Sequence, residues 1–197
     1  MLLRFALGVA GIAIAATLAL AETAPAPVQT PAPATPPAAT APPDEPFGED
    51  ATLTAKTIVY IKGNGTWDTA FQTITGSFKK LKAYTDKEGL KPDGLQMTVF
   101  TATDDTGFQY QAAVPVAEPP KSPPHGDIAL GQSPEGHALK FIHHGTYDDL
   151  DNTYEAITNY LDEKRLEAKD MFIEQYVTDP TTADPKQLTV NVYVLLK

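Results

Sequence analysis

The chain has 197 residues, a formal net charge of −10 and no cysteine, and 42% of its residues are hydrophobic. This length allows one domain of ordinary size or two small ones, and the hydrophobic content is sufficient for a packed core. The acidic balance argues against a nucleic acid partner, because proteins that bind nucleic acids present basic patches to the phosphates. Without cysteine, the chain cannot form disulfides, thiol nucleophiles or thiolate metal sites.

The first 21 residues have the three parts of a secretory signal peptide. Arg4 supplies a positive charge, residues 5–20 form an apolar run, and Ala19 and Ala21 are small residues at the positions that a signal peptidase reads. The alternative is a retained membrane anchor, although the run is slightly short for a span of about 20 residues. We predict that residues 1–21 are a signal peptide and that the protein is exported, periplasmic or otherwise outside the cytoplasm. It contacts a membrane only if this segment is uncleaved.

A linker rich in proline and alanine follows at residues 22–49. Half of the 18 prolines lie between Pro25 and Pro46. Such a segment cannot bury enough apolar surface to order itself, and proline favours the extended polyproline II conformation. We therefore predict a disordered spacer over residues 22–49 and one folded domain over residues 50–197.

The predicted domain repeats itself at an offset of 80 residues. Gly65-Thr66-Trp67-Asp68 has its counterpart in Gly145-Thr146-Tyr147-Asp148, and each motif follows a short strand and precedes an amphipathic helix. In each helix the apolar residues recur at spacings of three and four, which indicates one buried stripe. We expect Thr146 to cap the second helix and Thr66, more weakly, the first. The stripes are Trp67, Phe71, Ile74, Phe78 and Leu81 in the first helix, and Tyr147, Leu150, Tyr154, Ile157 and Leu161 in the second.

Two strands are predicted after each helix, so that each half reads β-α-β-β. The halves cover about residues 52–117 and 127–197. The predicted fold class is α+β: a duplicated, pseudo-twofold β-α-β-β unit with an antiparallel sheet, two helices on one face and a ligand cleft on the other. The predicted strands are 57–62, 96–102 and 108–116 in the first half, and 139–143, 171–177 and 188–196 in the second.

One carboxylate stands out on the predicted strand 171–177. Side chains alternate across a strand, so Glu174 shares a face with Phe172 and Tyr176. A carboxylate among aromatic rings suits a delocalised cation, through charge pairing and cation–π contact. Desolvation would raise its pKa, which would equally suit a general acid or base. Alternation alone does not separate these roles from a solvated surface carboxylate.

The residues around this strand resemble those of the GyrI-like (gyrase-inhibitor-like) family. The resemblance rests on Phe141-Ile142-His143-His144-Gly145-Thr146-Tyr147-Asp148-Asp149-Leu150, a helix, Ile173-Glu174-Gln175-Tyr176-Val177-Thr178-Asp179-Pro180, and an alternating final strand. It covers about residues 52–197. The same domain is the effector-binding module of multidrug-sensing transcription regulators.

The resemblance implies a domain that binds small, often aromatic and cationic, molecules. It also implies that Glu174 faces the cleft and meets the positive charge of the ligand, whereas some relatives use this acid to hydrolyse strained cyclic compounds. The chain lacks DNA-binding helices, so the regulator role is not implied. The predicted ligand-binding residues are Glu174, Tyr176, Phe172, Tyr147, Trp67, Tyr110 and Tyr193.

Three hypotheses follow, and the first is preferred. The protein is an exported small-molecule-binding protein with Glu174 as charge partner, a hydrolase with Glu174 as catalytic acid or base, or an envelope protein-interaction module whose cleft is filled by its own side chains. No cofactor is expected. No metal site is expected either, because His143 and His144 are adjacent on a strand and point to opposite faces.

Overall fold

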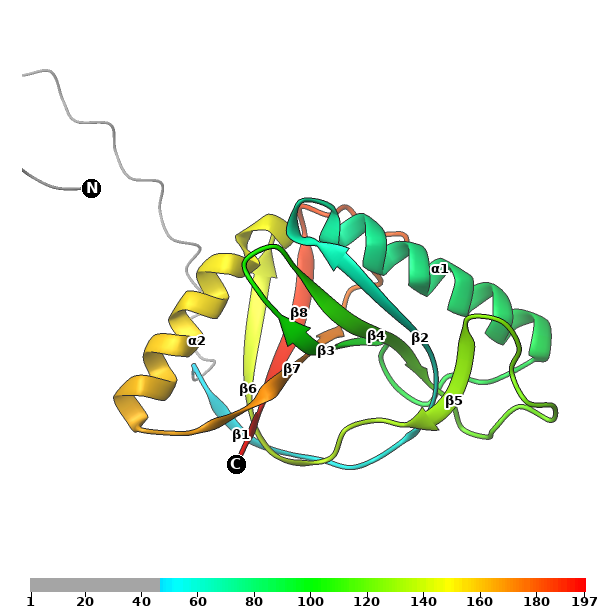
Figure 1. The fold of residues 1–197 in the computed structure, drawn as a ribbon, viewed down its shortest axis with the longest axis horizontal. Coiled ribbons are helices and arrows are strands. Elements are labelled where there is room, and N and C mark those ends of the chain that lie inside the picture. The colour runs from blue at the N-terminus through cyan, green and yellow to red at the C-terminus, as the bar shows by residue number, and fades with distance from the viewer. Residues whose placement is uncertain (1–46) are drawn as a thin grey trace, which may run out of the picture. The chain divides into compact units, whose positions relative to one another are not determined.

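The structure is a computed structural model that describes residues 47–197 (Figure 1). These residues form one eight-stranded sheet in which every neighbouring pair of strands is antiparallel, together with two long helices. The predicted signal peptide and all but the last three residues of the predicted linker lie outside the described residues. Neither helix of residues 47–197 is long and apolar enough to cross a membrane.

Both halves contain the predicted β-α-β-β unit, and the structure adds one short strand to each. The added strands are β1 and β5, which are the two edges of the sheet. The first unit comprises β2 (Thr57–Thr66), α1 (Ala70–Glu88), β3 (Met97–Thr103) and β4 (Gly107–Pro115), and the second comprises β6 (Gly136–Gly145), α2 (Leu150–Lys164), β7 (Ala168–Tyr176) and β8 (Leu188–Leu196). The edge strands are β1 (Glu49–Leu53) and β5 (Ile128–Gln132).

The two halves exchange their edge strands. The strand order is β1-β6-β8-β7-β3-β4-β2-β5, so β1 precedes β2 in the chain but pairs with β6, and β5 precedes β6 but pairs with β2. At the centre β3 and β7 lie side by side, with Thr98 opposite Glu174. The halves are therefore joined by a continuous ladder of backbone hydrogen bonds through the middle of the sheet.

Local chemistry marks the start of the second helical segment and the end of α1. The Thr146 hydroxyl accepts a hydrogen bond from the Asp149 amide at 3.1 Å, which confirms the expected cap, whereas Thr66 makes no such bond. A short 3₁₀ turn, η1 (Trp67–Thr69) or η2 (Tyr147–Asp149), precedes each helix. α1 ends at Gly89, whose φ of 66° lies in the left-handed region that glycine adopts without strain.

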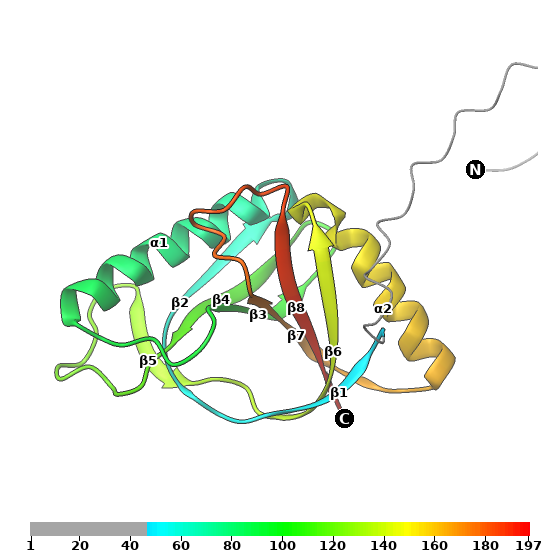
Figure 2. The same ribbon diagram turned by 180° about the vertical axis from the view of Figure 1, so that it is seen from behind.

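The helices cover one face of the sheet, where the larger hydrophobic core lies. Ile74 and Phe78 of α1 and Ile157 of α2 pack there against inward-facing strand residues such as Val192. Figures 1 and 2 show that the two helices begin near each other and then diverge along the sheet. A smaller apolar cluster that includes Ile173 lies on the opposite face.

This arrangement corrects the expected position of the ligand cleft. The cleft was expected on the face opposite the helices. Glu174 instead shares the helix-covered face, because neighbouring residues of a strand point to opposite sides and Ile173 belongs to the other face. Any ligand that reaches Glu174 must therefore lie between the sheet and the two helices.

Candidate ligand-binding site

Glu174 lies at the centre of a buried polar cluster. Its side chain is 2% exposed, and three tyrosine hydroxyls donate hydrogen bonds to its carboxylate. Tyr154 of α2 donates to Oε1 at 2.9 Å, and Tyr176 of β7 donates to Oε2 at 2.5 Å. Tyr147, at the turn before α2, donates to Oε2 at 3.4 Å and makes the longest of the three bonds. The cluster thus brings together a strand, a helix and the turn that precedes that helix.

Burial dominates the electrostatics of this cluster. Desolvation raises the pKa of Glu174 to about 7, although the three tyrosine hydroxyls lower the pKa by stabilising the ionised form. The same burial, together with the negative charge of Glu174, raises the pKa of each of the three tyrosines well above 10, so each hydroxyl keeps its proton as a donor. None of the ion pairs between described residues involves Glu174. Among residues 47–197, the carboxylate therefore has hydrogen-bond donors but no partner of opposite charge.

The position opposite Glu174 is occupied by Thr98 of β3. This residue is completely buried, and its hydroxyl makes no hydrogen bond of good geometry. The hydroxyl nevertheless lies close enough to Tyr176 to lower the pKa of that phenol slightly against the larger effect of burial. The contact does not meet the usual distance and angle requirements of a hydrogen bond.

Local structure fixes Tyr147 above Glu174. Gly145 ends β6 with a φ of 143°, a conformation that residues with a side chain rarely adopt, and it turns the chain toward α2. The buried His143 then binds both sides of this turn, since its Nδ1 lies 2.8 Å from the Thr153 hydroxyl and its Nε2 lies 2.8 Å from the Thr146 carbonyl. The carbonyl can only accept, so Nε2 carries the proton. Burial lowers the pKa of His143, which favours this neutral form.

Aromatic rings form the apolar surroundings of the cluster. Phe172 stacks on Phe100 with ring centroids 4.5 Å apart, and Tyr154 packs edge-to-face with Phe172 with ring centroids 4.9 Å apart. The ring of Trp67 stacks on Phe100 and extends this series of rings. Its indole N–H donates a hydrogen bond to the Asp104 carbonyl at 2.8 Å. Trp67 is 40% exposed, so the series runs from the buried acid to the surface of the first half. Such rings offer negatively polarised faces to a cation.

The structure brings together only part of the predicted site. Glu174, Tyr176, Phe172 and Tyr147 are in one cluster, and Trp67 lies at its rim. The other two predicted residues lie elsewhere. The Tyr110 hydroxyl is 2.8 Å from that of Ser77 under α1, and Tyr193 lies on the opposite face, where its hydroxyl donates to Gln175 at 3.4 Å.

Sequence reasoning missed Tyr154, which makes the closest hydrogen bond from a helix to Glu174. It was assigned only to the buried stripe of the second helix. Its position seven residues after Tyr147 was the available signal, because residues seven apart lie on the same face of a helix. Residues 47–197 contain no group of three or more His, Asp or Glu side chains that could hold a metal ion.

The fold and the buried acid define a class of protein: a pseudo-symmetric α+β domain with its candidate site between the sheet and the helices. Residues 51–197 match the model of the GyrI-like small molecule binding domain. The chain therefore belongs to the GyrI-like family. A search of curated protein sequences finds no match.

Solved structures with the same fold include a transcription regulator, a hydrolase and a complex with tetraphenylphosphonium. EcmrR in a complex with DNA has a TM-score of 0.65 and 13% identity, over 76% of this chain and 57% of that chain, and its separately solved C-terminal domain has a TM-score of 0.60, 15% identity and coverage of 76% and 96%. A hydrolase from Listeria innocua has a TM-score of 0.56 and 13% identity, with coverage of 77% and 92%. SAV2435 bound to tetraphenylphosphonium has a TM-score of 0.51 and 15% identity, with coverage of 76% and 93%.

This chain corresponds to only part of the full EcmrR chain. This chain spans 57% of the EcmrR chain that binds DNA, but nearly all of its C-terminal domain. The shared region is thus the C-terminal domain. At these identities the likeness concerns the fold.

Proposed function

We propose that this domain binds a small aromatic cation and that the ionised Glu174 is the charge partner of the ligand. The observation that carries the proposal is a buried carboxylate with three hydroxyl donors and no ion pair with any described residue. An unpaired buried charge is unfavourable, and a bound cation would offset that cost. The tetraphenylphosphonium bound to SAV2435, a protein of the same fold, supports this ligand class.

Access to Glu174 requires movement of the aromatic side chains above it. The half-buried Tyr147 makes the longest hydrogen bond to the carboxylate, and its ring contacts Phe71 of α1 at 5.1 Å between centroids. Both residues lie near the point where the two helices begin, and both are only partly buried. We propose that the Tyr147 ring swings outward and that the ligand enters between α1 and α2.

The closed site also bears on the interaction-module hypothesis, which expected a cleft filled by the protein's own side chains. Side chains do cover Glu174, but that hypothesis gives no reason to bury a carboxylate without a cationic partner. A small-molecule-binding domain gives such a reason, and the family model supports it.

The proposal can be tested by titrating the domain with tetraphenylphosphonium at pH 8. We expect saturable binding to the wild type and a loss of about 10- to 100-fold in affinity for Glu174→Gln, the size expected for a desolvated charge pair. Glu155→Gln, an exposed acid on α2, is the matched control and should bind like the wild type. Triphenylphosphine oxide, which is neutral, should not distinguish the variants. Equal affinity of wild type and Glu174→Gln for the cation would refute the role of Glu174.

A hydrolase remains the second candidate, because a pKa of about 7 places Glu174 where one group can both give and take a proton near neutral pH. Tyr147 or Tyr176 would then orient the substrate or the attacking water. Hydrolysis of an epoxide such as styrene oxide is a direct assay. Turnover that disappears in Glu174→Gln while the compound still binds would favour the enzyme, and binding without turnover would favour the ligand-binding protein.

We also propose that the protein is exported and that its ligand is met outside the cytoplasm. The proposal rests on the signal-like residues 1–21 and the proline-rich residues after them. Expression of the full chain in a bacterium, followed by mass spectrometry of the secreted or periplasmic product, should give a mature N-terminus at Glu22. A full-length product in the cytoplasmic fraction would overturn export, and a full-length product in the membrane would indicate an anchor.

A further inference from the structure

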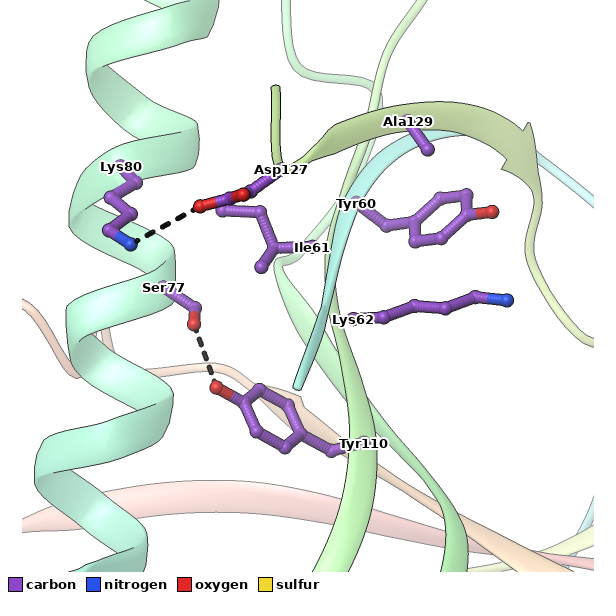
Figure 3. A pocket seen from close by; sticks show the side chains of 8 residues that line it. All are labelled: Tyr60, Ile61, Lys62, Ser77, Lys80, Tyr110, Asp127 and Ala129. Atoms are coloured by element: carbon purple, nitrogen blue, oxygen red, sulfur yellow. Dashed lines mark hydrogen bonds and ion pairs between the residues drawn. The ribbon is translucent and has the colours of Figure 1, made fainter. Parts of the chain in front are cut away.

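A separate cavity lies in the first half, between α1, β2 and the end of β5 (Figure 3). Its volume is about 490 Å³, which lies within the range of roughly 300–1,000 Å³ that is usual for small-molecule sites. Its lining includes Ile61, Ser77, Lys80, Tyr110 and Asp127, and it includes neither Glu174 nor any of the three tyrosines that bind it. The cavity is therefore distinct from the Glu174 site.

The second half shows what occupies the equivalent place there. The offset of 80 residues carries Ile61 to Phe141 and Lys80 to Tyr160. The edge strands extend the comparison. Tyr60 of β2 pairs with Ala129, and its counterpart Lys140 of β6 pairs with Glu49. Ala129 and Glu49 are therefore equivalent positions. Asp127 and Phe47, which lie two residues before them, are equivalent as well.

A phenyl ring of the chain itself fills this place in the second half. The ring of Phe47 packs against Phe141 at 5.0 Å and against Tyr160 at 5.8 Å between centroids. In the first half, the corresponding Asp127 and Lys80 carry no ring and form an ion pair at 3.7 Å. The cavity of the first half therefore corresponds to the position that the Phe47 ring occupies in the second half.

The lining offers a bound ring apolar surface and one exposed ion pair. Ile61 and the ring of Tyr110 offer apolar surface, and the hydroxyls of Ser77 and Tyr110 are paired at 2.8 Å (Figure 3). Lys80 and Asp127 are the charged groups on the helix side of β2, whereas Lys62 lies beside Tyr60 on the other side (Figure 3). A carboxylate on a bound ring would meet Lys80 in competition with Asp127. Both members of the Lys80–Asp127 pair are largely exposed, and such a pair contributes little and can open at small cost.

We propose that this cavity is a second ligand site, which binds a small aromatic anion with its ring against Ile61 and its carboxylate on Lys80. The ring takes the place that Phe47 fills in the other half. The carboxylate replaces Asp127 as the partner of Lys80. The site goes beyond the function proposed above, because its ligand has the opposite charge to the one expected at Glu174.

The test is a titration of the domain with 2-naphthoate, followed by amide chemical shifts. The key variant is Lys80→Tyr/Asp127→Phe, which copies the Tyr160 and Phe47 of the second half onto exposed positions and should fill the cavity with its own rings. We expect saturable binding to the wild type with shifts on β2 and β5, and a loss of at least about tenfold in the double variant. Lys79→Met, an exposed neighbour on α1 outside the lining, should bind like the wild type.

Two further measurements make the result decisive. The neutral 2-naphthalenemethanol should bind about fivefold more weakly than naphthoate, the size expected for one partly exposed charge pair. Glu174→Gln should leave naphthoate binding unchanged, and Lys80→Tyr/Asp127→Phe should leave tetraphenylphosphonium binding unchanged, so that failure at one site is not confused with failure at the other. The absence of saturable naphthoate binding, or equal affinity in the double variant, would overturn the second site.

Discussion

The two halves of this domain share a backbone but differ in their buried chemistry. Gly63 pairs with Tyr110, and their counterparts His143 and Val190 pair in the same way, so one offset of 80 residues relates β2 to β6 and β4 to β8. The central strands then align as well. Phe100 pairs with Tyr110 and Tyr176 pairs with Val190, which makes Phe100 the equivalent of Tyr176.

Each member of the Glu174 cluster has a counterpart that cannot take its role. Thr98 stands at the place of Glu174, and the three tyrosines that donate to Glu174 are replaced by residues without a hydroxyl. The duplication thus supplied two equivalent sites, and only the second half carries the acid and its donors. The replacements in the first half are Trp67 for Tyr147, Ile74 for Tyr154 and Phe100 for Tyr176.

The halves also differ in which strand of an equivalent pair carries the large side chain. In the first half, glycine at position 63 makes room for the ring of Tyr110, which would lie 2.7 Å from an added Cβ. In the second half, the large residue is His143 and the small one is Val190. The large side chain thus lies on β4 in the first half and on β6 in the second. This exchange lets His143 support the turn that carries Tyr147.

Among the differences between the halves, the buried acid should have the largest effect on the free energy of unfolding. Folding raises the pKa of Glu174 from 4.5 to about 7, so the folded protein holds a proton that the unfolded chain releases. The resulting stabilisation, about 3 kcal/mol, is fully present below pH 4.5 and is lost as the pH rises through 7. Relative to Glu174→Gln, the wild type should therefore lose this much stability between pH 4 and pH 8, as measured by urea unfolding.

Because other groups titrate over the same range, the informative quantity is the difference between wild type and variant at each pH. Glu155→Gln provides the control for loss of an exposed acid, and its difference from the wild type should be small. A difference between wild type and Glu174→Gln that does not change with pH would contradict the raised pKa.

The exchange of large and small residues predicts the next effect. Gly63→Ala places a Cβ against the buried and hydrogen-bonded ring of Tyr110, and overpacking of this kind should destabilise the protein by about 1–3 kcal/mol. Gly76→Ala, on the exposed face of α1 with open space around it, should stabilise by about 0.5–1 kcal/mol. Urea unfolding of both variants measures the contrast.

A double variant sharpens this prediction. Combining Gly63→Ala with Tyr110→Val recreates the small strand partner of the second half and removes the ring with which the new Cβ collides. The loss in the double variant should be smaller than the sum of the two single losses. Additive losses would show that the glycine is not there to accommodate Tyr110.

The smallest effect is expected at the residue opposite the acid. Thr98→Val keeps the shape and removes a buried hydroxyl that lacks a good hydrogen bond, so stability should rise by at most about 1 kcal/mol. A loss of more than this amount would show that the hydroxyl is bonded to Tyr176. In that case the pKa of Glu174, followed by NMR of the carboxyl carbon, should also change.

The Glu174 cluster was only partly predictable from the sequence. Glu174, Phe172 and Tyr176 could be grouped because alternation along one strand is a local property. Tyr110 and Tyr193 were included as aromatic residues on neighbouring predicted strands, and the structure places them under α1 and on the opposite face. Tyr154 was recognised as part of a buried stripe, but not as a donor to Glu174, because that contact joins two elements whose docking the local pattern does not contain.

The sequence by itself determined the duplication, the order of elements within each β-α-β-β unit and the presence of the acid in the second half alone. These features are carried by short-range periodicity and by motifs repeated along the chain. Only the tertiary structure decided that the edge strands cross between the halves, that the helices cover the face of Glu174, and that three tyrosines converge on its carboxylate. These features depend on strand register and helix docking between residues far apart in the chain. They raise the pKa of this acid because only the assembled core excludes water from it.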